Sequence, residues 1–142
     1  MANTEKLVIK VTNRPPKNGN EDLYEWFCEV FGLANKGAEI EPLILKEIVG
    51  NSVSGEGVTS KNLNEKLSIP RSTVIYHLNR FIYSGLVIRK GRKYYLRSND
   101  MESTIEELQA DMVREFNRMM EFAEMLDKIT MDVFYGRRKR QK

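Results

Sequence analysis

Positively charged side chains are concentrated in the middle of this 142-residue chain. Residues 60–97 contain nine lysines and arginines and a single acid, Glu65, although the net charge of the whole chain is only +3. Repulsion within such a stretch is relieved when phosphates neutralise it, and release of counterions then favours association. The composition therefore predicts that residues 60–97 bind a nucleic acid.

The sequence contains no comparable pattern for catalysis or metal binding. Cys28 is the only cysteine, so an intrachain disulfide or a cluster of thiolates cannot form, and His77 is the only histidine, so a metal site would depend on carboxylates. A nucleophile, a base and an orienting acid do not occur at a recognisable spacing. We therefore predict a protein that is not an enzyme and that needs no metal or other cofactor.

Membrane insertion and secretion are also not indicated by the sequence. It lacks an apolar run near the ~20 residues that span a bilayer, and residues 1–12 lack the apolar core and cleavage pattern of a signal peptide. The expected location is cytoplasmic, without a membrane partner. No set of residues converges on a small-molecule site, so the sequence does not identify an effector.

Two helices separated by a tight turn would position the cations. The first is expected to begin at Ser60, whose hydroxyl can cap it, and it carries Leu63 and Leu67 on one face. Pro70 interrupts this pattern and suits the first turn of a second helix, which starts at Arg71. In the second helix, apolar residues recur at i, i+4 and i+7, and we expect these to be buried: Val74, Leu78 and Phe81.

The outward face of the second helix is polar and basic. Arginine can pair with guanine or phosphate and asparagine with adenine, while hydroxyl groups reach phosphates or base edges. Ile75 could meet a thymine methyl group, or instead make a dimer or core contact. His77 could contact DNA or serve as a hydrogen-bonded structural histidine. The candidate DNA-binding residues of this helix are Arg71, Ser72, Thr73, Ile75, Tyr76, His77, Asn79 and Arg80.

A hairpin with a basic tip is expected to follow. Gly85 can adopt the left-handed conformation that closes the helix, and residues 86–88 and 94–96 are β-branched, aromatic or aliphatic runs joined through a glycine. Its cations would contact the sugar-phosphate backbone, together with two residues at the start of the first helix. The hairpin candidates are Arg89, Lys90, Arg92 and Lys93, and the helix candidates are Ser60 and Lys61.

The order of residues in this region resembles a known family. The run SIPRSTVIYHLNRFIYSGLV followed by RKGRKYYL is similar to the winged helix-turn-helix of ArsR/MarR-like transcriptional regulators, of prokaryotic or archaeal type. The most telling parts are T-V-x-x-H-L, G-L-V and G-R-x-Y-Y, and the resemblance covers residues 39–98. It implies that residues 71–80 form a recognition helix for the DNA major groove, and that residues 89–93 form a wing on the backbone or minor groove.

Upstream segments are expected to complete the core. Residues 39–49 predict the first helix of the winged domain, with Ile40, Leu43, Ile44 and Ile48 on one side, and residues 51–57 predict an exposed Gly/Ser connection. Residues 1–38 read as an extension in which a strand at 7–11 precedes a helix. The apolar stripe of that helix comprises Leu23, Trp26, Phe27, Val30 and Phe31. Cys28 lies off the stripe beside acidic residues, which predicts an inert thiol.

A long C-terminal helix is predicted over residues 99–135, which contain neither proline nor glycine. Nine of its ten heptad a and d positions are apolar, which indicates a sustained packing face. We expect a homodimer through this helix; the alternative is that it folds back onto its own winged domain. The dimerisation residues are Ile105, Leu108, Met112, Phe116, Met119, Phe122, Leu126, Ile129 and Val133. Residues 136–142 predict a disordered basic tail, which adds phosphate contacts or only solubility.

Together these patterns predict a mainly α fold with a small β-hairpin wing: an N-terminal extension (1–38), a winged helix-turn-helix domain (39–98), a dimerisation helix (99–135) and a basic tail (136–142). The expected function is sequence-specific DNA binding by a homodimeric transcriptional regulator. The rival is a winged helix that binds protein as a subunit of a transcription or RNA-processing assembly. A face that binds protein should be apolar. The outward face of the second helix is instead mostly polar, since it carries Arg71, Tyr76, Asn79 and Arg80.

Overall fold

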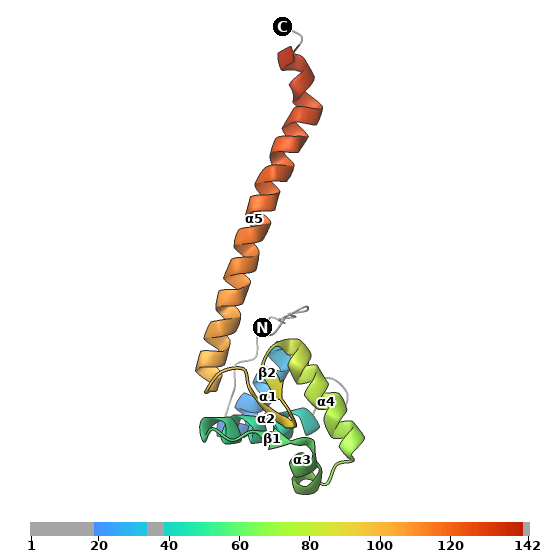
Figure 1. Ribbon diagram of the computed structural model, residues 1–142, viewed down its shortest axis with the longest axis vertical. Helices are drawn as coiled ribbons and strands as arrows, with labels where there is room; N and C mark the ends of the chain where they lie inside the picture. Colours follow the sequence, from blue (N-terminus) through green and yellow to red (C-terminus); the bar gives the residue numbers. More distant parts are fainter. Residues whose placement is uncertain (1–18, 34–38, 141–142) are drawn as a thin grey trace. The chain divides into compact units, whose positions relative to one another are not determined.

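The computed structural model describes residues 19–33 and 39–140. It is mainly helical, with a small three-stranded antiparallel sheet and a long C-terminal helix (Figure 1), which confirms the coarse fold class. The chain divides into two compact units, of which the first ends at Ile105 and the second begins at Glu106. The strand expected at residues 7–11 lies outside the described residues. Within the described part, no helix is long and apolar enough to cross a membrane.

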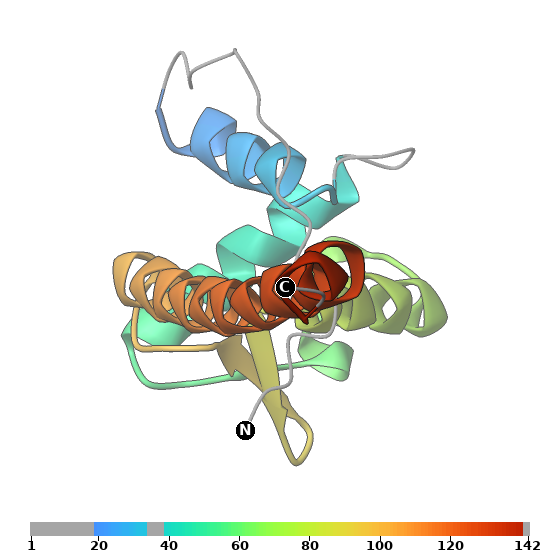
Figure 2. The ribbon, with the colours of Figure 1, turned by 90° about the horizontal axis from the view of Figure 1, so that it is seen from above.

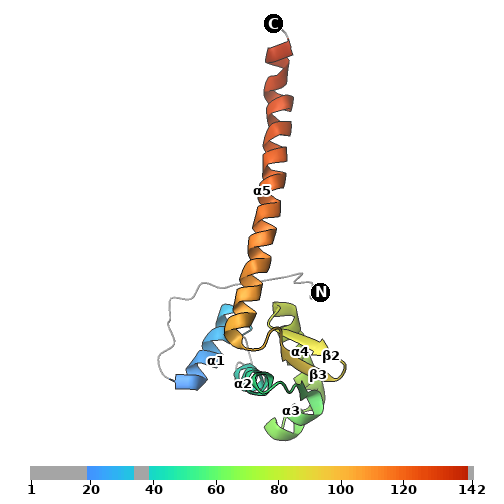
Figure 3. The same cartoon turned by 60° about the vertical axis from the view of Figure 1, so that its left-hand side comes forward.

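The first unit contains every element up to the beginning of the long helix, and the rest of the long helix forms the second unit. In the first unit, α1 contacts α2, α3 contacts α4, and the sheet contacts α2 and α4 (Figure 3). In chain order the elements are α1 (Gly19–Val30), α2 (Ile40–Val53), β1 (Val58–Thr59), α3 (Ser60–Leu67), α4 (Arg71–Ser84), β2 (Val87–Lys90), β3 (Lys93–Leu96) and α5 (Met101–Arg140).

The buried side of α1 differs from the expected stripe. Cys28 is fully buried and Phe31 nearly so, whereas Leu23 is 43% exposed. Cys28 was expected off the stripe because the pattern of large apolar residues did not include it. A free cysteine behaves as a small hydrophobic residue, and the thiol of Cys28 is buried accordingly.

Because the thiol of Cys28 is buried, we expect the stability of the protein to depend on pH. Burial, followed by the charges of Glu41, Glu25 and Glu29, raises the pKa of this thiol to about 12. Between the unfolded pKa of about 8.5 and the folded pKa, the folded chain keeps a proton that the unfolded chain has lost, so stability falls as pH rises. From pH 8 to pH 10, wild type should lose about 1–2 kcal/mol more than Cys28→Ala in urea unfolding. Parallel pH profiles of the two proteins would contradict this.

Helix α2 forms the centre of the core and is longer than expected. Ile44, Leu45 and Ile48 are completely buried, whereas Leu43, expected on the same side, is 47% exposed. The helix continues to Val53 instead of ending at residue 49. The extra turn connects α2 to β3, because the hydroxyl of Ser52 accepts a hydrogen bond from the backbone N–H of Leu96 at 2.9 Å. Part of the expected connection at 51–57 is therefore helix that holds β3.

Local signals place α3 and α4 where the sequence predicted them. The cap of α3 is Thr59 rather than Ser60: its hydroxyl accepts the N–H of Asn62 at 3.0 Å, and the Asn62 side chain accepts the N–H of Thr59 in return. Such a reciprocal cap satisfies two N–H groups of the first turn. As expected, Gly85 closes α4 in the left-handed conformation, with φ of 88°. The predicted core positions of α4 are all completely buried: Val74, Leu78 and Phe81.

The sheet has one more strand than the predicted hairpin. Its order is β1-β3-β2, both pairs are antiparallel, and Val58 of β1 lies opposite Tyr94 of β3. A two-residue strand carries no alternating pattern that sequence could reveal. The β2–β3 hairpin turns at Gly91, whose φ is 63°, and its tip lies at the edge of the first unit (Figures 2 and 3).

Gly57, just before β1, allows the strand to approach β3 closely. A Cβ atom placed there would lie 2.8 Å from the Cβ of Lys93 and 2.8 Å from the Tyr95 ring. Gly57→Ala should therefore destabilise the protein by about 1–3 kcal/mol in thermal or urea unfolding. Gly50→Ala in α2 is the matched control, because nothing lies within 4 Å of its Cβ position. The control should gain about 0.5–1 kcal/mol; similar losses in both variants would contradict the steric explanation.

The long helix α5 begins at Met101, and its first turn belongs to the core of the first unit. Thr104 is completely buried, and its hydroxyl accepts the N–H of Ser98 at 3.1 Å. The hydrogen bond from the N–H of Ser103 caps the helix through Asp100 and lowers the pKa of that carboxyl. The helix ends at Arg140, so residues 137–140 are helical rather than part of a separate tail. Arginine and lysine suit a helix C-terminus, which offsets the low helix propensity of the preceding glycine.

Candidate nucleic-acid interface

A groove lined by cations lies between α3, α4 and the β2–β3 hairpin. Its volume is about 480 Å³. Six of the predicted nucleic-acid contacts line it, four of them cations from three separate elements, and none of the lining residues is a carboxylate. We call it the basic groove. Its lining residues are Thr59, Ser60, Lys61, Arg71, Ile75, Arg89, Arg92 and Tyr94.

Neighbouring side chains orient two of the guanidinium groups. Arg71 donates through Nε to the hydroxyl of Ser60 at 3.2 Å, and Ser60 itself is 8% exposed. The predicted backbone contact at Ser60 is thus mainly a support for Arg71. Arg89 donates through Nε to the carbonyl of Gly91 at 2.8 Å, and its guanidinium lies 5.5 Å from the ring centre of Tyr94. Both arginines are therefore held by weak local contacts, which leave their remaining N–H groups for an anion.

The beginning of α4 adds a partial positive charge beside the groove. The residue that precedes the helix, Pro70, provides no side-chain hydrogen bond to its first N–H groups. The free N–H groups of a helix start and the helix dipole both favour an anion at this position. Arg71 and Ser72 in this first turn are exposed, and Thr73 is half-buried.

Farther along α4 the exposed face is mixed in character. Tyr76 is 57% exposed and Ile75 is 37% exposed, and Asn79 is also exposed. These three residues remain available for contact with another molecule. Ile75 also lines the basic groove, so its apolar side chain is not part of the core.

His77 is buried and Arg80 is only partly exposed. His77 is 6% exposed, and its Nδ1 lies 2.9 Å from Oε2 of Glu41, a carboxylate that is 2% exposed. Nε of Arg80 lies 2.9 Å from the same carboxylate oxygen. His77 and Arg80, both predicted as DNA contacts, therefore surround the buried carboxylate of Glu41. We call these three residues the Glu41 cluster. For His77 this is the structural alternative. Arg80 also has a partner within the chain, but its side chain is 25% exposed.

Arg80 connects this cluster to the end of α1. One terminal N–H group of its guanidinium donates to the carbonyls of Gly32 and Leu33, at 3.4 and 3.1 Å. Burial by itself lowers the pKa of Arg80, but the hydrogen bond to Tyr76 and the charge of Glu41 outweigh burial and raise it. Arg80 therefore remains charged and links α4 to Glu41 of α2 and to the carbonyls that follow α1.

The outer side of the hairpin carries the other predicted cations. Lys90 and Lys93 are exposed and lie opposite each other in the β2–β3 register. Lys90 also lies 5.7 Å from the ring centre of Tyr95. Successive strand residues face opposite sides, so Lys90 does not line the groove as Arg89 does. Two like charges directly opposite destabilise a hairpin unless an anion neutralises them.

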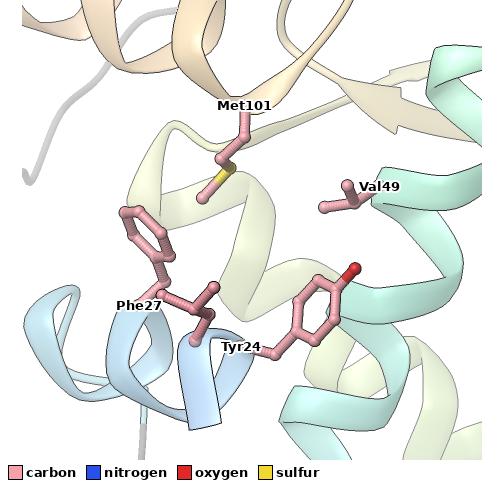
Figure 4. Close-up of a pocket in the computed structure, with 5 residues that line it drawn as sticks. Tyr24, Phe27, Val49 and Met101 are labelled. Carbon is pink, nitrogen blue, oxygen red and sulfur yellow. The ribbon is translucent and has the colours of Figure 1, made fainter. Parts of the chain in front are cut away.

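An apolar pocket of about 190 Å³ lies elsewhere in the first unit (Figure 4). Phe27 of α1 points toward Met101 at the start of α5, and Tyr24 of α1 points toward Val49 of α2. The pocket offers no charged group to orient a ligand. In the described residues, no three side chains of His, Cys, Asp or Glu gather as a metal site would require.

The predicted site did not include three residues that contribute to the groove or to the buried cluster. Thr59 and Tyr94 line the basic groove, and Glu41 holds the buried cluster. A signal for Glu41 was present, because Glu41, Leu45 and Ile48 follow the i, i+4, i+7 spacing of one helix face. A glutamate on such a face indicates a buried partner.

Comparison with known proteins gave no matching family model, no matching curated protein and no matching solved structure. The inference about function therefore depends on the geometry and charge of the site.

Proposed function

We propose that this protein is a sequence-specific, double-stranded DNA-binding transcriptional regulator of the winged helix-turn-helix type, and that it acts as a homodimer. In this proposal α3 and α4 are the helix-turn-helix, α4 is the recognition helix and the β2–β3 hairpin is the wing. The basic groove is the observation that supports it most directly. Lys61, Arg71, Arg89 and Arg92 converge there from three elements without an acid among the lining residues.

The charges outside the groove strengthen the argument. Some of the nine cations in residues 60–97 are used within the chain: Arg80 pairs with Glu41, and Lys66 pairs with Glu47 at 2.8 Å. Among the four groove cations, Lys61 lies 4.0 Å from Glu65, and because both of these side chains are mostly exposed, solvent screens this long ion pair. A polyanion is the partner that such an arrangement fits best.

Different residues would then have different tasks. With α4 in the major groove, Arg71 would pair with guanine or phosphate and Asn79 with adenine, while Ser72 and Tyr76 contact phosphates or base edges. Arg89 and Arg92 of the wing would bind the sugar-phosphate backbone, which positions the protein without reading sequence.

The homodimer is supported by the second unit. From Val113 to Tyr135, large apolar side chains of α5 are more than half exposed, among them Phe116, Phe122 and Leu126. An apolar surface this long on a single helix needs a partner in water, and a second copy of the same helix is the simplest one. Leu108, expected in the dimer interface, is instead 3% exposed within one chain.

An electrophoretic shift with mixed genomic fragments tests the proposal. The logarithm of the binding constant should fall by about 4 or more per protomer for each tenfold rise in salt, if each groove cation neutralises one phosphate. Arg71→Ala should reduce discrimination between selected and random duplexes by about 1–3 kcal/mol. Arg92→Ala is the matched control and should weaken binding to both duplexes alike. Binding that ignores salt, or a stable complex with protein only, would contradict the proposal.

A further inference from the structure

Tyr76 and Arg80 lie one turn apart on α4, and their side chains contact each other. One terminal nitrogen of the Arg80 guanidinium donates to the Tyr76 hydroxyl at 3.4 Å, and the guanidinium carbon lies 5.8 Å from the centre of the tyrosine ring. Residues four apart face the same side of a helix, so their spacing allows this contact. Arg80 therefore holds the Tyr76 side chain, although Tyr76 is 57% exposed.

Arg80 is itself anchored on its other sides. Its Nε lies 2.9 Å from the buried carboxylate of Glu41, and its second terminal nitrogen donates to the carbonyls of Gly32 and Leu33 at 3.4 and 3.1 Å. A guanidinium is planar and rigid, so these contacts fix the direction of the remaining terminal nitrogen. That nitrogen is the one that contacts Tyr76. The orientation of an exposed tyrosine thus depends on a buried carboxylate.

The Tyr76 ring has a second neighbour that is held by Glu41. The rings of Tyr76 and His77 meet edge to face, with 5.1 Å between their centres and 74° between their planes. Nδ1 of His77 lies 2.9 Å from Oε2 of Glu41. A side chain that is already ordered by anchored neighbours loses less conformational freedom on binding, which lowers the entropic cost. Tyr76 is therefore preorganised for contact with another molecule.

The contact with Arg80 also affects what the tyrosine hydroxyl offers to a ligand. A phenolic hydroxyl can both donate and accept hydrogen bonds. Because a positively charged N–H donates to its oxygen, the hydroxyl proton turns away from the guanidinium, and polarisation makes the hydroxyl a stronger donor. The Tyr76 hydroxyl is therefore suited to an acceptor atom. In DNA the acceptors are phosphate oxygens and, in the major groove, atoms of guanine, adenine and thymine.

We propose that Arg80 is a positioning residue, which holds Tyr76 so that the tyrosine hydroxyl donates a hydrogen bond to an acceptor atom of the bound DNA. This inference rests on the proposed function, since DNA is the ligand proposed there. It gives Arg80 an indirect role, because the arginine acts on DNA through Tyr76. Removal of the Tyr76 hydroxyl should therefore weaken binding only while Arg80 is present.

DNA binding by four full-length proteins tests this dependence: wild type, Tyr76→Phe, Arg80→Lys and the double variant. Tyr76→Phe should weaken binding about 3–10-fold, as expected for one lost hydrogen bond. Arg80→Lys keeps the positive charge beside Glu41 but lacks the guanidinium fork. In this background Tyr76→Phe should change affinity by less than about twofold. A phosphate acceptor predicts equal losses for selected and random duplexes, and a base acceptor predicts a larger loss for the selected duplex.

A destabilised control separates positioning from a general effect on folding. Ser52→Ala removes the hydroxyl that accepts the N–H of Leu96, so it should lower stability without removing a contact of Tyr76 or Arg80. In the Ser52→Ala background, Tyr76→Phe should keep its full effect on DNA binding. Equal effects of Tyr76→Phe with and without Arg80→Lys would overturn the inference and leave the proposed function intact. Absence of DNA binding by wild type would overturn both.

If Arg80→Lys does not fold, the contact can be measured in proteins that keep Arg80. NMR signals of isotope-labelled arginine report on the guanidinium groups, and those of Arg80 should shift between wild type and Tyr76→Phe. Tyr83→Phe is the matched control, because Tyr83 is on the same helix and is 59% exposed. It should leave the Arg80 signals unchanged. Unchanged Arg80 signals in Tyr76→Phe, or equal shifts in both variants, would overturn the inference.

Discussion

Glu41→Ala is expected to lower the free energy of unfolding by about 3–5 kcal/mol, because it leaves the buried His77 and the partly buried Arg80 without their carboxylate partner. His77 and Arg80 both lie 2.9 Å from Glu41 Oε2, and the side chains of His77 and Glu41 are 8% and 2% exposed. A loss of this size is a large part of the stability of a small domain. Urea unfolding followed by circular dichroism measures it.

Glu47→Ala is the matched control on the same helix. Glu47 pairs with Lys66 at 2.8 Å, but the lysine side chain is 65% exposed, so solvent weakens the pair. The control should therefore cost only about 0–1 kcal/mol. Equal losses in the two variants would mean that the Glu41 cluster contributes no more than a surface ion pair.

Phe122→Asp is expected to weaken the proposed dimer more than 100-fold, or about 2.7 kcal/mol. Phe122 is 57% exposed in the single chain and lies in the middle of the apolar stretch of α5. An aspartate in a desolvated interface loses its hydration without gaining a partner, and it also removes the buried aromatic area. The dissociation constant is measured by sedimentation or by light scattering across a range of concentrations.

Asn117→Asp provides the control for Phe122→Asp. It adds the same charge to the same helix, but residue 117 lies on the side away from the apolar stretch. The control should dimerise like wild type. An equal effect of both substitutions would show that charge on α5, rather than loss of the apolar contact, changes association.

The two units differ in whether their proposed binding surface could be predicted from the sequence. In the second unit, the residues proposed to pair are readable from the heptad pattern, because one helix brings together residues three and four apart. In the first unit, the basic groove combines Lys61, Arg71 and the hairpin arginines, which are up to about thirty residues apart in the chain. Sequence predicted each cation but not the groove that they share.

By itself, the sequence determined the position of each major helix and of the hairpin. Spacing of apolar residues, Pro70 before α4 and Gly85 after it act within one or two turns, so their physical effect is local. The segregation of charge onto residues 60–97 was equally visible, since it depends on composition alone.

Only the tertiary structure decided which polar residues face solvent. His77 and Arg80 turn inward because Glu41, 36 residues before His77, is buried beside them. Cys28 enters the core and β1 joins β3 for the same kind of reason. Contacts between residues distant in the chain leave no periodic signal, and an unpaired buried charge costs so much that its partners follow it into the core.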